Sequence, residues 1–211
     1  MSKDFNIRSL ILPFIIGIVL GITAKLVDVP YITSRLPIFD DIMGRFGIWV
    51  WAAALIAILS KTPFLAAMRS FVFFIGMLSA YYGYTVLFLN FFPKSQMILW
   101  GGIAIGTPFC GFLLWHIHEK KHSAAIIASL PFTIFFTEWY LTAFINPYWT
   151  AKDKLLLFIA YLCMTFSLSA AIPTNKKRFS CLLYGLLLSI ILICLIQAEI
   201  ILNPYELLLN I

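Results

Sequence analysis

Residues 63–91 read PFLAAMRSFVFFIGMLSAYYGYTVLFLNF, and this stretch decides the fold class. Arg69 is its only charged residue. A helix over the whole stretch would be about 43 Å long at ~1.5 Å per residue, whereas the hydrocarbon core of a bilayer is ~30 Å thick. The stretch therefore predicts a transmembrane helix that tilts or projects beyond the membrane.

Comparable apolar runs occur on both sides of this stretch. Of the 211 residues, 62% are apolar and 11% are charged, whereas soluble domains are about half apolar and about a quarter charged. Seven spans of ~22 residues would use about 154 residues, which leaves no room for a soluble catalytic or nucleic-acid-binding domain. We therefore predict one transmembrane domain, residues 1–211, with an all-α polytopic helix bundle.

Turn signals divide the apolar runs into seven expected helices. Their ranges are 9–25, 39–60, 63–91, 96–117, 124–145, 155–172 and 179–202. Capping side chains mark helix starts, and prolines disfavour helical backbone in the residue before them. The boundary residues identified in this way are Thr62-Pro63, Ser95 and Ser123 at helix starts, and Asn146-Pro147 and Pro173 at helix ends.

The net charge of +6 is explained by topology rather than by a nucleic-acid partner, because the basic residues are scattered in ones and twos. With a cytoplasmic N-terminus, the inner side holds nine basic residues and the outer side six. The inner set is Lys3, Arg8, Lys61, Arg69, Lys120, Lys121, Lys176, Lys177 and Arg178, and the outer set is Lys25, Arg35, Arg45, Lys94, Lys152 and Lys154. Because cytoplasmic loops are enriched in Lys and Arg, we predict a cytoplasmic N-terminus and an outside C-terminus.

The segment His118-Glu119-Lys120-Lys121-His122 satisfies the H-E-x-x-H pattern of zinc proteases. That chemistry needs both histidines on one face of a supported helix and a third ligand nearby. Here both intervening residues are lysines, no third ligand lies on the same side, and Ser123 begins the next span at once. We therefore interpret the segment as a solvated cytoplasmic turn, and reject His118, Glu119 and His122 as metal ligands. The four cysteines lie inside apolar runs and lack the spacing of metal ligands. We predict no cofactor.

Ionisable residues inside the spans are the best candidates for function, because burying a charge in lipid is costly and such residues usually face the bundle interior. Glu138 lies about two turns inside the outer end of the fifth expected helix. Topology places further polar residues in the same leaflet: Lys25, Asp28, Tyr81, Tyr82, Tyr84, Tyr140 and Glu199. They predict an outward-facing pocket with Glu138 as anchor, Lys25 as a counter-ion and tyrosines as walls.

A structural alternative uses the same residues. Lys25 or a tyrosine would then neutralise Glu138, and Glu199 would simply reach the interface. The tyrosines would belong to the aromatic belt at the membrane surface.

Small residues indicate where helices approach closely. Gly76, Ala80 and Gly83 share one face of the third expected helix, and Gly102 and Gly106 form a G-x-x-x-G pattern in the fourth. These stripes fit packing within one bundle. The alternative is a seam with a second copy or with another membrane protein.

Several further residues form a pattern across about residues 10–145. The pattern comprises Thr23-Ala24-Lys25, Gly47-Ile48-Trp49-Val50, Ser60-Lys61-Thr62-Pro63, Phe73-Phe74, Gly76-Met77, Tyr81-Tyr82-Gly83-Tyr84, Phe92-Pro93, Trp100, Pro108, Trp115 and Glu138-Trp139-Tyr140. It resembles a family of small multi-pass membrane proteins of Gram-positive bacteria, a domain of unknown function. The resemblance implies a bacterial plasma-membrane protein and implies no activity. The family carries a Gly-rich or basic turn in place of His118–His122, which further disfavours zinc.

Catalytic templates are missing from the sequence: there is no G-x-S-x-G, no P-loop and no pair of adjacent intramembrane carboxylates. The leading hypothesis is therefore a non-enzymatic protein of the bilayer that binds or transports a small, cationic or hydrogen-bonding solute. The alternative is an accessory envelope protein for immunity, sensing or assembly that acts through helix contacts. A membrane-embedded enzyme acting on lipid is the third hypothesis.

Overall fold

The computed structural model describes residues 7–28, 39, 42–119, 121–145 and 150–198, and every regular element in this part of the chain is helical. The α-helices are α1 (Arg8–Val27), α4 (Phe46–Ile58), α5 (Pro63–Leu89), α6 (Lys94–Trp115), α7 (His122–Tyr140), α8 (Ala151–Ala171) and α9 (Asn175–Gln197). A 3-10 turn, η1 (His116–His118), follows α6, and a π-helical turn, η2 (Leu141–Ile145), follows α7. The predicted all-α class is confirmed.

Six of these helices are long and apolar enough to cross a membrane, which is compatible with a multi-pass membrane protein. The exception is α4, which has 13 residues and a length of about 20 Å at ~1.5 Å per residue. It begins at Phe46 rather than at the expected position 39. Phe39, Ile42 and Met43 are helical, but Arg45 has extended backbone with φ −98° and ψ 158°, which separates them from α4. At 27 residues, α5 exceeds the bilayer core, as its sequence predicts.

Two predicted helix boundaries are confirmed. The Thr62 hydroxyl accepts a hydrogen bond from the Leu65 amide at 3.2 Å, so Thr62 caps α5. At the other boundary, α8 stops before Pro173, and Ile172 has the extended backbone that a following proline favours. Local side-chain chemistry therefore sets these two ends.

Two predicted caps are wrong. Ser95 and Ser123 lie inside the first turns of α6 and α7, because each helix begins one residue before its serine. The residues at the N-cap positions are Pro93 and Lys121, and neither provides a side-chain cap. The expected stop at 146–147 lies outside the described residues.

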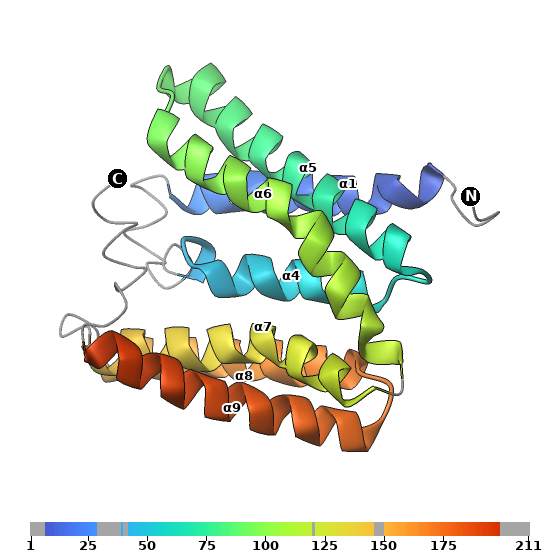
Figure 1. Ribbon diagram of the computed structural model, residues 1–211. Coiled ribbons are helices and arrows are strands. Elements are labelled where there is room, and N and C mark those ends of the chain that lie inside the picture. The colour runs from blue at the N-terminus through green and yellow to red at the C-terminus, as the bar shows by residue number, and fades with distance from the viewer. Residues whose placement is uncertain (1–6, 29–38, 40–41, 120, 146–149, 199–211) are drawn as a thin grey trace. The chain divides into compact units, whose positions relative to one another are not determined.

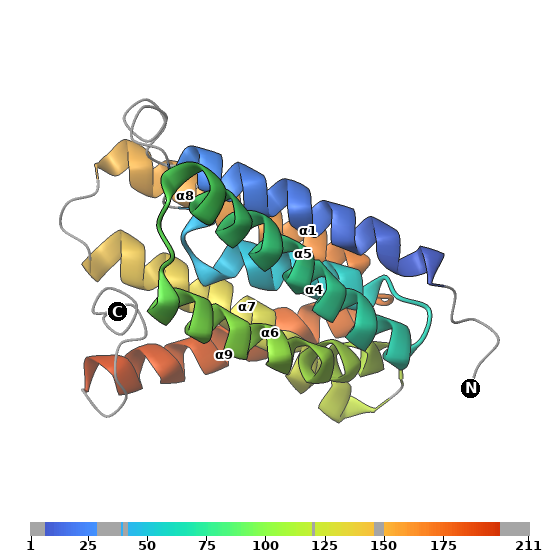
Figure 2. The same cartoon turned by 90° about the horizontal axis from the view of Figure 1, so that it is seen from above.

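The chain divides into two structural units, Met1–His116 and Ile117–Ile211. The first unit contains α1, α4, α5 and α6, and α5 packs against each of the other three. Figures 1 and 2 both show α1 running alongside α5. The second unit contains α7, α8 and α9, with α9 packed along α7.

Glycines bring α1 and α5 into backbone contact. A Cβ atom added to Gly17 would lie 2.1 Å from the Phe73 carbonyl oxygen, and one added to Gly21 would lie 2.4 Å from that of Met77. Gly76 of α5 likewise faces a carbonyl oxygen of α1, at 2.5 Å from an added Cβ. Because the contacts advance in the same direction along both helices, α1 and α5 are parallel.

One end of the first unit is joined by side-chain hydrogen bonds. The Arg69 guanidinium donates to the Ser9 carbonyl oxygen (3.2 Å) and to the Ser60 hydroxyl (3.4 Å). The Trp115 indole donates to the Ser60 carbonyl oxygen at 2.8 Å. The starts of α1 and α5 therefore meet the ends of α4 and α6.

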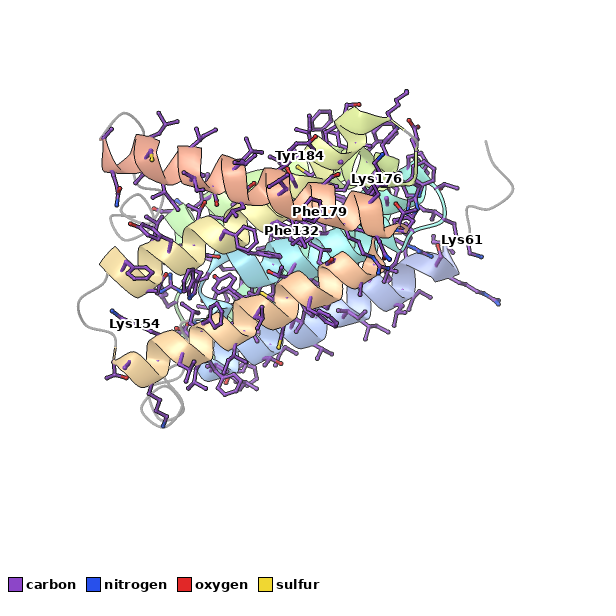
Figure 3. The ribbon with its side chains drawn as sticks, turned by 90° about the horizontal axis from the view of Figure 1, so that it is seen from below. Lys61, Phe132, Lys154, Lys176, Phe179 and Tyr184 are labelled. Carbon is purple, nitrogen blue, oxygen red and sulfur yellow. The ribbon has the colours of Figure 1, made fainter. Side chains whose placement is uncertain are left out.

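In the second unit, α7 and α9 are also parallel. Gly185 of α9 approaches Phe132 of α7, with 2.7 Å between an added Cβ and the Phe132 Cβ. One turn earlier, the Cys181 thiol lies 3.5 Å from the Ala125 carbonyl oxygen. Since α8 connects the two helices, it returns in the opposite direction, and Figure 3 shows Lys154 of α8 and Lys176 of α9 at opposite ends of this unit.

Basic residues bind helix-terminal carbonyls at the end of the second unit where α9 begins. Lys177 donates at 2.5 Å to the carbonyl oxygens of both Ile117 and Glu119. Arg178 donates at 2.9 Å to the carbonyl oxygens of Ile172 and Ala170, at the end of α8. Cations are favourable at C-terminal carbonyls, which have no intrahelical donor.

Candidate functional site

Glu138 lies in the last turn of α7 and is buried, with 1% of its surface exposed. The Tyr161 hydroxyl donates to its carboxylate at 2.5 Å. Tyr161 comes from α8, whose antiparallel course brings its middle beside the end of α7. The Tyr161 ring also contacts that of Phe135, with 6.2 Å between ring centroids. Glu138 is therefore a buried carboxylate held by a neighbouring helix of its own unit, and ionisable residues in membrane helices usually face other helices in this way.

Two threonines beside Glu138 have buried hydroxyls. Thr137 and Thr142 are 5% and 3% exposed, and neither hydroxyl has a hydrogen-bond partner within the described parts of the chain. Thr142 follows Glu138 by four positions, the spacing that puts two side chains on one helix face. A hydroxyl has one donor and two acceptor lone pairs. The end of α7 thus combines a carboxylate with hydroxyls that retain hydrogen-bonding capacity.

The π-helical turn η2 follows Tyr140 directly. π-helical turns are rare in proteins, and those that occur often lie at functional sites. Gln197 of α9 donates to the Tyr140 hydroxyl at 3.2 Å. The end of α7 is therefore tied to α9 through Tyr140 and to α8 through Glu138.

The predicted counter-ion, Lys25, is located in the first unit. Its ammonium forms an ion pair with Asp28 and lies 4.9 Å from the centroid of the Tyr81 ring. The Tyr81 hydroxyl also donates to the Asp28 carboxylate at 3.2 Å. Lys25, Asp28 and Tyr81 thus form one cluster, in which the lysine has a carboxylate partner.

The other two predicted wall residues differ in their contacts. The Tyr82 ring lies against that of Tyr81, with 5.2 Å between ring centroids. Tyr82 is 6% exposed and contacts the ring of Phe92, with 6.4 Å between centroids. Tyr84 stacks on Phe88 at 4.6 Å, and Phe88 is 68% exposed. These two tyrosines therefore do not share one wall. Glu199 lies outside the described residues.

The structure brings the predicted site residues together only in part. Glu138 and Tyr140 belong to the second unit, whereas the lysine and the three tyrosines of the first unit belong to Met1–His116. Each unit is a set of residues that contact mainly one another. The gathering of all these residues in one pocket therefore remains a prediction.

The H-E-x-x-H segment is not one continuous helix. Its first histidine ends the 3-10 turn η1, and α7 begins only at His122. Glu119, between them, pairs with Lys121 at 3.4 Å. The described part of the segment therefore does not offer the continuous helix that the zinc-protease pattern needs, and the described residues hold no group of three His, Cys, Asp or Glu side chains suited to a metal ion.

Tyr161 is the site residue that sequence reasoning missed. Tyrosines of membrane helices concentrate at the interfaces, yet Tyr161 lies in the middle of α8. A tyrosine so far from a helix end needs a hydrogen-bond partner in the interior. The position of Tyr161 in the middle of an apolar run was therefore the sequence feature that could have indicated a buried hydrogen-bond partner such as Glu138.

Six helices of membrane-spanning length and apolar composition are compatible with one class, a multi-pass helical membrane protein. Comparisons with protein-family models, with curated proteins and with solved structures found no match to this chain. The resemblance to the Gram-positive membrane family therefore remains a prediction. The site has to be interpreted from its own chemistry.

Proposed function

We propose that this chain is a multi-pass protein of a bacterial plasma membrane that binds a small cationic solute at Glu138. The observation that carries the proposal is the carboxylate itself, 1% exposed and held by the Tyr161 hydroxyl at 2.5 Å. The resemblance of about residues 10–145 to membrane proteins of Gram-positive bacteria supports the location. The excess of basic residues in the loops assigned to the inner side supports a cytoplasmic N-terminus.

The neighbouring hydroxyls favour one kind of cation. A primary ammonium has three N–H donors. We expect the Glu138 carboxylate and the Thr142 hydroxyl, four positions further on, to accept from such donors, and both side chains are buried. A quaternary ammonium has the same charge but no donor, so the site should discriminate between the two.

Thermal unfolding of the purified full-length protein in detergent tests this proposal. Propylammonium chloride is the probe, and sodium chloride at equal ionic strength is the reference. A ligand that binds only the folded state raises the unfolding midpoint by linkage, so we expect a rise of several degrees, about 2 to 4 °C for a chain of this size. Tetramethylammonium chloride should give a smaller rise.

Variants assign the effect to the site. Glu138→Gln keeps the side-chain shape and an acceptor for Tyr161 but removes the charge, and it should abolish the propylammonium effect. Glu119→Gln is the matched control, because it removes a carboxylate from a loop of the same unit and should leave the effect unchanged. An identical rise in the wild type and in Glu138→Gln would rule out binding at Glu138.

An accessory role through helix contacts is the second candidate function, and one observation favours it. Gly102 and Gly106 are exposed on α6, and a Cβ added to either would meet no atom within 4 Å. The adjacent Ile105 and Phe109 are 76% and 68% exposed. This face has room for another helix. A cysteine-free chain carrying Gly106→Cys should form a disulfide-linked dimer in membranes if the partner is a second copy.

A further inference from the structure

The second unit contains an apolar groove separate from the Glu138–Tyr161 pair. Its volume is about 440 Å³, and its lining residues are Trp139, Ala143, Phe144, Lys154, Leu155 and Phe158. The Trp139 ring contacts those of Phe158 (5.3 Å between centroids) and Phe144 (5.7 Å). Phe144, Leu155 and Phe158 are 66%, 58% and 41% exposed, so apolar side chains remain open along the groove.

Two hydrogen-bond donors accompany this apolar lining. The Trp139 indole nitrogen is buried and has no acceptor within the described parts of the chain. Lys154, half-buried, extends its side chain from the first turn of α8 toward the end of α7, as Figure 3 shows. The lining contributes no carboxylate. The groove therefore offers donors and one positive charge.

Lys154 occupies a helix position that is unfavourable for a positive charge. It lies near the start of α8, where the helix dipole disfavours a cation. The adjacent acid, Asp153, is used in the helix cap, since its carboxylate accepts from the Thr150 hydroxyl (2.6 Å) and amide (3.3 Å). An anion bound at Lys154 would offset the unfavourable dipole.

We propose that this groove binds one anionic phospholipid. Its acyl chain would lie along Phe144, Leu155 and Phe158, and its phosphate would accept hydrogen bonds from Lys154 and Trp139. The start of a membrane-spanning helix lies at the depth of the lipid headgroups, and Trp and Lys are the residues that anchor proteins there. The required occupant has an anionic head and an apolar tail, and an anionic phospholipid meets both needs.

Quenching of tryptophan fluorescence by brominated lipids tests the proposal on the full-length protein in vesicles. The Trp139 signal is defined as the difference between the wild type and Trp139→Phe. We compare phosphatidylcholine vesicles that contain either brominated phosphatidylglycerol or brominated phosphatidylcholine. The association constant at Trp139 should be at least about threefold higher for phosphatidylglycerol.

Lysine variants assign the selectivity to the groove. Lys154→Gln should reduce the ratio of the two constants to about 1, since its charge is lost, and Lys154→Arg should retain the preference. Lys152→Gln is the matched control: it removes the same charge from an exposed residue in the same turn and should leave the ratio unchanged. Helical content from circular dichroism verifies that each variant is folded.

Three outcomes would overturn the proposal. One is equal quenching of wild-type Trp139 by both lipids. Another is a preference that survives in Lys154→Gln. The third is an equal loss in Lys154→Gln and Lys152→Gln, which would assign the preference to general surface charge.

Discussion

The hydrogen bond between Tyr161 and Glu138 is the contact on which the candidate site depends. Hydrogen bonds to charged groups contribute about 1.5 to 3 kcal/mol to stability. We therefore expect Tyr161→Phe to lower the free energy of unfolding by about 2 kcal/mol. Equilibrium unfolding in mixed micelles measures this change.

Tyr184 provides the matched control at the same scale. It lies on α9 in the same unit, is partly exposed, and is labelled in Figure 3. Tyr184→Phe removes the same atom and should change stability by less than about 0.5 kcal/mol. Combining Tyr161→Phe with Glu138→Gln should then cost less than the sum of the single variants, because both disrupt one contact. If the losses in free energy of unfolding simply add in the double variant, Tyr161 and Glu138 are not energetically coupled.

Glu138 was identifiable from the sequence because a carboxylate in an apolar run is unusual by composition alone. Its partner was harder to identify: Tyr161 is one of nine tyrosines, and although its position in the middle of an apolar run indicates a buried partner, nothing local shows that it faces α7. That choice depends on the rotation of α8 about its axis. Tertiary packing sets this rotation, and a single sequence does not encode it in a readable pattern.

At the scale of elements, the contact between α1 and α5 depends on glycine. An added Cβ at Gly17 would overlap the Phe73 carbonyl oxygen, at 2.1 Å, and a backbone atom cannot move aside as a flexible side chain does. Gly17→Ala should therefore separate the two helices and lower the free energy of unfolding by about 2 kcal/mol or more. Thermal unfolding in detergent measures the loss.

Gly106→Ala is the control for this helix contact. Gly106 lies in a helix as Gly17 does, but an added Cβ there meets no atom within 4 Å. Alanine has the higher helix propensity, by up to about 1 kcal/mol, so this variant should unfold at the same temperature or slightly higher. Equal destabilisation by Gly17→Ala and Gly106→Ala would show that the α1–α5 contact is not the cause.

The glycine pattern illustrates what the sequence leaves open about packing. Gly76 was predicted to lie at a close helix contact, and it does, facing α1. Gly83 was predicted to lie on the same stripe, yet an added Cβ there would meet nothing within 4 Å. The stripe follows a helix face, but the crossing of two helices limits close contact to part of that face. The G-x-x-x-G formed by Gly17 and Gly21 was not singled out, although it makes the closest approach.

The helix directions determine the number of membrane crossings expected for the whole chain. Parallel packing of α1 and α5 means that the chain returns between them, and only α4 and its flanking residues are available to do so. The same reasoning assigns a crossing to α8, between the parallel helices α7 and α9. We therefore expect seven crossings even though α4 has 13 residues, with the two chain ends on opposite sides.

The distribution of basic residues then predicts which side is cytoplasmic. The turn before α9 contains Lys176, Lys177 and Arg178, whereas the start of α8 contains Lys152 and Lys154 together with Asp153. Within the second unit these two sets lie at opposite ends, as Figure 3 shows for Lys154 and Lys176. The more basic end should be retained in the cytoplasm.

Labelling of single cysteines tests this orientation in intact cells. In a cysteine-free chain, Lys152→Cys and Lys176→Cys replace exposed residues at the two ends of the second unit. A maleimide that does not cross membranes should label Lys152→Cys in intact cells and Lys176→Cys only after permeabilisation. The reversed pattern would place the N-terminus outside. Labelling of both sites in intact cells would mean that α8 does not cross the membrane, and the expected seven crossings would then be wrong.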